Sequence, residues 1–132
     1  MPSAFARERA MSLLLVGLGG GLGAMARYLL ALALAPMAVT FPWATLAANV
    51  TGSAAMGLLA AWLVRSGDPA AVRLLVGTGL LGGFTTFSTF SLETVALWER
   101  GEVGLAIGYA SLSLLLAVAG LLCGLALGRA IL

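Results

Sequence analysis

Four long apolar stretches, separated by short segments that carry proline, glycine or charge, make up almost the whole chain. They cover approximately residues 12–35, 44–64, 70–98 and 103–128. A helix needs about 20 mainly apolar residues to cross the hydrocarbon core of a bilayer, and each stretch reaches that length. The pattern therefore predicts an all-α integral membrane protein in which residues 1–132 form a single domain of four transmembrane helices.

The third apolar stretch differs from the other three, because glycines and hydroxyl side chains interrupt it between Gly77 and Glu93. This segment, GTGLLGGFTTFSTFSLE, holds four glycines, three phenylalanines and a run of serines and threonines. Glycine and threonine are weak helix formers, so we expect the helix to break near residues 82–86. Broken backbone is tolerated at membrane depth only inside protein or beside a polar cavity. The segment therefore indicates a binding or permeation site for an ion.

The side chains that follow the expected break suit such a site. Thr85, Thr86 and Ser88 can cap a new half-helix, and the carbonyls released before it can hold a cation. Phe87 and Phe90 are three residues apart and share a helix face. The positive edges of their rings can contact an anion, although packing is the commoner role of phenylalanines at this spacing.

The other apolar stretches contain few polar side chains. Asn49 can either bond a neighbouring helix or offer its amide N–H groups to a passing anion, and the polar third helix nearby favours the second role. Tyr109 and Ser113 lie on one stripe of the fourth helix. Glu93 is the only acidic residue expected within a transmembrane stretch, where it either bonds the break or lies in a vestibule.

Glycines at intervals of four predict close helix packing. The first helix carries two such pairs and the fourth helix a longer zipper, which we expect to face the polar third helix together with the stripe of Tyr109. These glycines are Gly17 with Gly21, Gly19 with Gly23, and the series Gly120, Gly124 and Gly128. Arg27 lies deep in the first apolar stretch, where it either attracts an anion or bonds helix-end carbonyls as a structural group.

Composition and charge narrow the function further. The chain is 61% hydrophobic and 9% charged, with a mean hydropathy of +1.10, far from the values of a soluble domain. Without histidine and with one cysteine, it has no zinc or haem ligand set and no intrachain disulfide, and its scattered arginines form no nucleic-acid stripe. Residues 1–11 are expected to be a polar lead to a retained first helix, because the apolar run resumes too soon for a cleaved secretory signal. The sequence shows no nucleophilic side chain paired with a general base, so nothing in it suggests an enzyme.

Four segments together resemble the Fluc fluoride-channel family, also known as CrcB. They occur in the family's order and cover nearly the whole chain, and the GGFTTFSTF run is the most specific of them. The segments are GGGLGAMARY (19–28), TLAANVTGS (45–53), GLLGGFTTFSTFSLE (79–93) and YASLS (109–113). The resemblance implies a fluoride-selective passive channel in the cell (plasma or inner) membrane, which exports fluoride from the cytoplasm and lowers its intracellular concentration. It also implies a four-helix subunit with a broken third helix, assembled as an antiparallel, dual-topology homodimer with two pathways.

The same resemblance assigns roles to individual residues. Asn49, Phe87 and Phe90 would line the fluoride pathway, and the backbone carbonyls of Gly82 and Thr85 would hold a structural sodium ion. Arg27 matches the family's first-helix arginine. The polar track would be extended by Thr86, Ser88, Thr89, Tyr109 and Ser113, with Glu93 beside it.

The distribution of arginine conflicts with dual topology. With four spans, one side of the membrane receives five arginines and the other receives Arg100 alone. The five are Arg7, Arg9, Arg65, Arg73 and Arg129. The positive-inside rule then favours one orientation, so either the bias is overridden in a homodimer or the subunit pairs with an oppositely inserted paralogue.

Two other functions are compatible with part of the pattern. A small proton-coupled multidrug-type exporter needs an ionisable acid inside the membrane, and Glu93 would have to serve. A subunit with only an assembly role would explain the glycine zippers but not the hydroxyl groups of the third helix.

Overall fold

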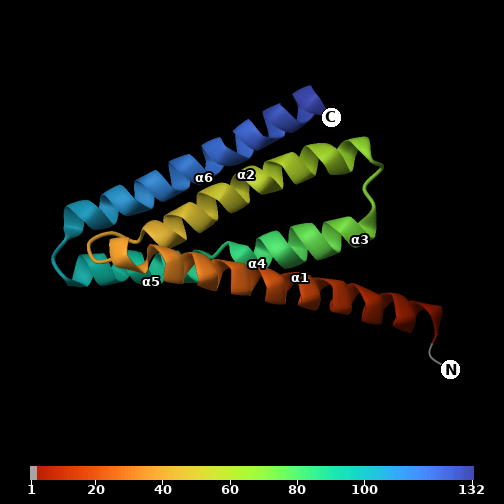
Figure 1. Cartoon of the computed structure of the whole chain (residues 1–132), viewed down its shortest axis with the longest axis horizontal. Helices are drawn as coiled ribbons and strands as arrows, with labels where there is room; N and C mark the ends of the chain where they lie inside the picture. Colours follow the sequence, from red (N-terminus) through yellow and green to blue (C-terminus); the bar gives the residue numbers. More distant parts are fainter. Residues whose placement is uncertain (1–2) are drawn as a thin grey trace.

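The computed structural model describes residues 3–132, and this part of the chain contains four helices long and apolar enough to cross a membrane. The third of them is composite, and Figure 1 shows the chain with its α-helices labelled. Their bounds are Ala4–Leu34 (α1), Ala35–Met37 (the 3₁₀ turn η1), Trp43–Arg65 (α2), Ala70–Val72 (α3), Arg73–Leu81 (the π-helix η2), Gly82–Phe84 (α4), Phe87–Glu99 (α5) and Val103–Ile131 (α6). The predicted all-α membrane fold with a broken third helix is confirmed.

The first helix begins at Ala4 instead of near Ser12, so the expected polar lead is mostly helical. The hydroxyl oxygen of Ser3 accepts a hydrogen bond from the Ala6 backbone N–H at 3.2 Å and caps the helix. The residues that follow are mainly alanine, arginine and glutamate, which are strong helix formers whether or not they are apolar. Hydropathy therefore located the membrane-embedded part and missed the first two turns.

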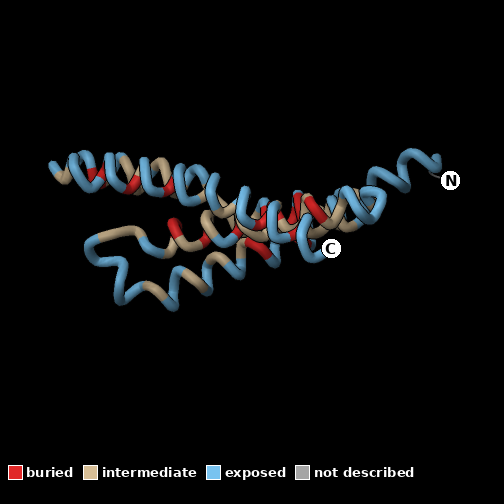
Figure 2. Tube along the Cα trace, turned by 90° about the horizontal axis from the view of Figure 1, so that it is seen from above, coloured by how far each residue is buried: buried red, intermediate tan, exposed pale blue. Residues whose placement is uncertain are grey.

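The four spans form two closely packed helix pairs. One pair is α2 with α6 and the other is α1 with η2 and α4, and the pairs diverge toward the end that holds both termini (Figure 1). Most positions of α1 and α6 are exposed in the single chain, whereas most positions of α2 and of the third span are half-buried or buried (Figure 2).

Glycine allows backbone contact within both pairs. A Cβ atom at Gly124 would collide with the Ala54 carbonyl oxygen, and one at Gly19 with the Leu75 carbonyl oxygen. The zipper of the fourth helix therefore faces α2 and not the third helix as expected, because α2 presents its own small residues, including Ala54 and Gly57, at matching positions. In the first helix, only the pair Gly19 and Gly23 is used, since a Cβ at Gly17 or Gly21 would meet nothing within 4 Å.

The segment before the break is wound more widely than expected. Arg73–Leu81 is a π-helix, whereas the sequence indicated an ordinary α-helix up to Gly77. Such wide turns are rare and concentrate at functional sites. Here Gly79 lies against Gly19 on α1, and Gly83 against Gly20.

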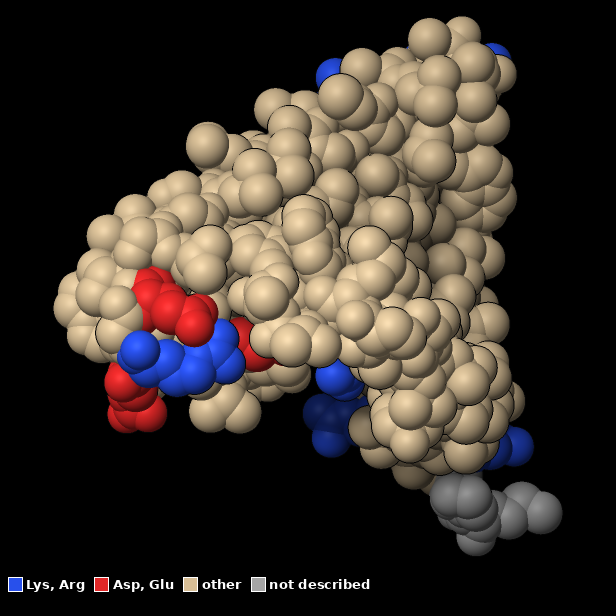
Figure 3. Space-filling view, turned by 60° about the vertical axis from the view of Figure 1, so that its left-hand side comes forward, with Lys and Arg blue, Asp and Glu red and all other residues tan. Residues whose placement is uncertain are grey.

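Charged groups lie mainly at the two ends of the bundle. Both termini and the connection between α2 and α3 are at one end (Figure 1), where Arg73 forms an ion pair with Asp68. At the other end Arg100 pairs with Glu102 at 3.1 Å. On the face shown in Figure 3, uncharged atoms cover most of the surface between these ends, as a lipid-facing protein requires.

We predict that Gly19→Ala lowers the free energy of unfolding by about 1–3 kcal/mol, because the new methyl group would push α1 away from η2. Unfolding of the purified protein in mixed detergent micelles, followed by tryptophan fluorescence, measures this change. Gly21→Ala is the matched control on the same helix, where space is open. Equal destabilisation by both substitutions would contradict the packing described.

Candidate functional site

The break consists of two residues in extended backbone conformation. Thr85 has φ −80° and ψ 158°, and Thr86 has φ −152° and ψ 123°, between the end of α4 and the start of α5. The Thr86 hydroxyl accepts the Thr89 backbone N–H at 3.2 Å and caps α5, whereas the Thr85 hydroxyl donates to the Leu81 carbonyl at 3.0 Å. Of the three expected capping residues, Thr86 alone is therefore the N-cap.

Asn49 on α2 pairs with the broken backbone. Its side-chain oxygen accepts the Thr86 backbone N–H at 2.8 Å, and its nitrogen donates to the Thr86 carbonyl at 3.0 Å. These two bonds replace the helical bonds that Thr86 lacks. An amide nitrogen has two N–H groups, so one of them remains for another acceptor.

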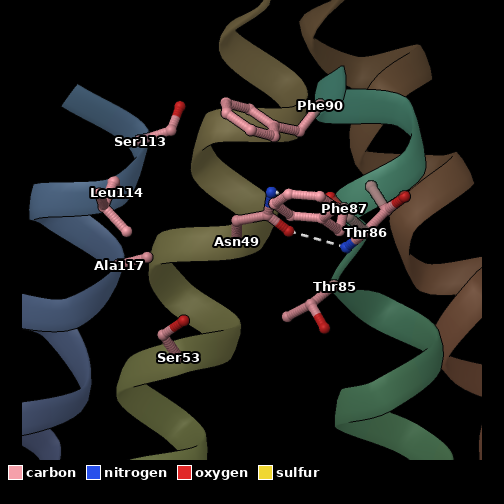
Figure 4. A pocket seen from close by; sticks show the side chains of 9 residues that line it. All are labelled: Asn49, Ser53, Thr85, Thr86, Phe87, Phe90, Ser113, Leu114 and Ala117. Atoms are coloured by element: carbon pink, nitrogen blue, oxygen red, sulfur yellow. Dashed lines mark hydrogen bonds between the residues drawn. The ribbon is translucent and has the colours of Figure 1, made fainter. Parts of the chain in front are cut away.

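A cavity of about 260 Å³ lies beside this pair, between α2, the break and α6 (Figure 4). Thr85, Thr86, Phe87 and Phe90 line it from the third helix. Asn49 and Ser53 line it from α2, and Ser113, Leu114 and Ala117 line it from α6. Its lining includes amide, hydroxyl and aromatic groups and no charged side chain.

Ser113 has an unusual environment in this cavity. The residue is 5% exposed, and its Oγ atom is buried without a hydrogen-bond partner within residues 3–132. Buried hydroxyl groups are normally paired, and an unpaired one costs about 1–3 kcal/mol. Because the Oγ atom is itself buried, it would donate to a ligand in the cavity only after its side chain turned toward that ligand.

The two predicted aromatic residues are placed differently. Their ring centroids are 5.5 Å apart, but Phe90 packs against Tyr109 at 5.3 Å, whereas Phe87 is 79% exposed. Phe90 is thus both a core residue and a wall of the cavity. Phe87 projects from a face that the single chain does not cover.

Glu93 is held away from this cavity by two hydroxyl groups. Thr45 donates to one carboxylate oxygen at 2.9 Å, and the fully buried Tyr109 donates to the other at 2.7 Å. The Tyr109 hydroxyl is therefore bonded to Glu93 and does not line the cavity that contains Ser113.

Glu93 instead lines a second cavity, of about 330 Å³, together with Arg27, Thr86 and Thr89. Arg27 Nε donates to the Gly83 carbonyl at 3.3 Å, so this arginine bonds backbone near the break and also faces the cavity. Thr86 borders both cavities. Thr86, the residue that Asn49 binds, is thus shared by the linings of both cavities.

The remaining hydroxyl groups of the predicted track cluster around Thr86. Its Oγ1 atom lies 3.1 Å from the Thr89 hydroxyl and 3.3 Å from the Ser88 hydroxyl. Ser88 is exposed, whereas Thr89 is partly buried.

Sequence reasoning missed two residues of α2. Thr45 orients Glu93, and Ser53 lines the first cavity. Thr45, Asn49 and Ser53 are spaced at intervals of four, which places them on one face of a helix. That spacing was the available signal for both.

The chain is similar to known proteins over most of its length. Residues 14–125 match the model of the family described as CrcB-like protein, Camphor Resistance (CrcB). The chain is similar to the fluoride-specific ion channel FluC of Novosphingobium aromaticivorans, at 51% identity over 88% of this chain and 94% of the relative. It is also similar to FluC of Mesorhizobium japonicum (50%; 91% and 98% covered) and to FluC 2 of Nitrobacter hamburgensis (53%; 90% and 98% covered).

We predict that Asn49→Leu destabilises the protein by about 2–6 kcal/mol, because the backbone N–H and carbonyl of Thr86 would both lose their partner at about 1–3 kcal/mol each. Detergent unfolding of the purified protein tests this. Thr51→Val on the same helix is the control, since that hydroxyl bonds only the Ala47 carbonyl. An unchanged unfolding midpoint for Asn49→Leu would show that Asn49 does not hold the break.

Proposed function

The chain belongs to the CrcB-like protein family, and we infer that it is a fluoride-specific ion channel, not an enzyme. We propose that it resides in the plasma membrane and lets fluoride leave the cytoplasm down its gradient, which lowers the intracellular concentration. The similarity to named fluoride channels extends over about nine tenths of the chain. Passive flow needs no cofactor-driven or covalent step.

The observation that carries the proposal is the uncharged donor set in the first cavity. Fluoride is small and strongly hydrated, so a pathway must replace its lost water with hydrogen-bond donors. The free N–H of Asn49 is such a donor, the unpaired hydroxyl of Ser113 would become one if its side chain turned toward the cavity, and the edges of Phe87 and Phe90 add weaker positive potential. Neutral donors can bind an anion and still release it, whereas a fixed cation would hold it more tightly.

We propose that the pathway continues past Thr86 to the second cavity. Thr86 and Thr89 offer hydroxyl groups on this side, with the exposed Ser88 3.3 Å from the Thr86 hydroxyl, and Arg27 faces the second cavity, where its charge attracts the anion. Tyr109 affects the pathway only indirectly, because its hydroxyl donates to Glu93. Glu93 then lies beside the track as an acceptor that keeps the hydroxyl groups of Thr45 and Tyr109 oriented.

A second copy of the chain, inserted in the opposite orientation, is proposed to cover the open side of the first cavity. The exposure of Phe87 supports this, since it marks a side of the break that the single chain leaves uncovered, and irregular backbone at membrane depth is tolerated only inside protein or beside a water-filled cavity. The five arginines at the end with both termini favour one orientation, so an oppositely inserted paralogue is the alternative partner.

A structural sodium ion is proposed at the carbonyl oxygens of Gly82 and Thr85. Both residues lie where regular helical bonding ends. Apart from bonds within the helices, no backbone N–H in residues 3–132 donates to either carbonyl. The described residues contain no cluster of acidic, histidine or cysteine side chains for a metal, so a site here would be made of backbone oxygen. Hard oxygen ligands from unwound backbone suit sodium, and the ion would hold the two sides of the break in place.

We predict that liposomes containing the purified protein release fluoride and retain chloride, as measured with ion-selective electrodes. Equal release of both ions, or no fluoride release, would overturn the channel function.

Glu93→Gln separates the channel from a proton-coupled exporter. A passive channel still conducts in part, because glutamine keeps an acceptor for Thr45, whereas an exporter stops transporting.

Phe87→Ile and Phe90→Ile are each predicted to lower fluoride release about fivefold or more, because the aliphatic side chain has no positive edge. Cross-linking should show the same assembly as in the wild type. Phe84→Ile is the control, since Phe84 lies on the same composite helix and does not line the cavity. Wild-type release rates in both variants would show that the rings of Phe87 and Phe90 contribute packing only.

A further inference from the structure

Building on the proposed function, we propose that Ser53 is a further fluoride-binding residue, at the end of the first cavity that leads toward Arg65 and Arg129. Ser53 lies one helical turn beyond Asn49 on α2 and is partly buried. Figure 4 shows it at the opposite end of the cavity from Ser113 and Phe90, with Asn49 between them. It thus extends the row of neutral donors by one turn.

The hydroxyl group of Ser53 is not engaged by its own helix. In apolar helices, serine and threonine usually donate to the carbonyl four residues earlier. Thr51, Thr85, Ser91 and Thr94 all do so, at 2.6 to 3.0 Å. Ser53 makes no hydrogen bond within residues 3–132, so its proton is available to a ligand in the cavity.

The other walls at this level offer no competing side-chain donor. On α6 the position one turn after Ser113 is Ala117, which lines the cavity with a methyl group. Across the cavity, Thr85 donates its hydroxyl proton to the Leu81 carbonyl. Among the described residues that line this end, Ser53 is therefore the free hydroxyl donor.

Helix packing sets the direction of the path beyond Asn49. A Cβ at Gly120 would lie 3.1 Å from the Val50 carbonyl oxygen, so α2 and α6 are in close contact just past Ala117. The lining of the cavity at this end includes Ser53 on α2 and Thr85 at the break. A dehydrated anion moving there from Asn49 meets the Ser53 hydroxyl next.

The test is fluoride release from liposomes containing Ser53→Ala. We expect release to fall about five- to tenfold, the effect of one lost hydrogen bond, with an unchanged unfolding midpoint. Ser91→Ala is the matched control, because that hydroxyl is bonded to the Phe87 carbonyl and does not line the cavity, and it should conduct at the wild-type rate.

Rescue distinguishes a donor from a packing role. In Ser53→Ala combined with Ala117→Ser, a hydroxyl returns on the α6 wall of the same cavity, and release should recover at least in part. If Ser53→Ala does not reconstitute, Ser53→Cys, a near-isosteric change to a weak donor, should give reduced release.

Two results would overturn the inference. Wild-type release from Ser53→Ala would remove Ser53 from the pathway while leaving the channel function intact. A wild-type protein that releases no fluoride would remove the proposed function and this inference together.

Discussion

The pair of hydrogen bonds between the Asn49 side chain and the backbone of Thr86 is the interaction on which the rest of the structure depends. A transmembrane helix normally satisfies its own backbone, and each unsatisfied group in hydrocarbon costs several kcal/mol. The third span leaves regular helical hydrogen bonding at Thr85 and Thr86, where its backbone is extended. Asn49 compensates from another helix, and by doing so it places a side chain with a spare N–H group beside the same opening. The stability of the break and the proposed ion binding thus both involve Asn49.

That arrangement requires helices to approach unusually closely, and glycine makes the approach possible. A Cβ at Gly52, three residues after Asn49, would collide with the methyl group of Thr85. On the far side of the break, Gly23 lies against the Leu80 carbonyl and fixes α1 against the third span. The break is therefore clamped between two glycine contacts, one from each helix pair. The polar site is precise because the apolar packing around it is tight.

Sequence reasoning was strongest where the chemistry is local. The weak helix propensity of the glycine and threonine run located the break, and hydropathy located the four spans, because both depend on neighbouring residues alone. It failed where the outcome depends on which helices meet. The zipper of Gly124 was assigned to the third helix, but α2 offers the better surface, and only Gly19 and Gly23 of the two first-helix pairs are used. Likewise, Tyr109 shares a stripe with Ser113, yet its hydroxyl is taken by Glu93, a partner that periodicity cannot identify.

The length of α1 also fixes how the subunit sits in its surroundings. A helix of 31 residues measures about 46 Å at 1.5 Å per residue, well beyond a hydrocarbon core of about 30 Å. Its first turns, with Arg7 and Arg9, therefore extend into the lipid headgroups, where guanidinium groups find phosphate. Because the rod is continuous from there to Arg27, anchoring at the headgroups sets the depth of the whole first span. The thickness of the bilayer would thereby determine the depth at which the proposed ion site lies.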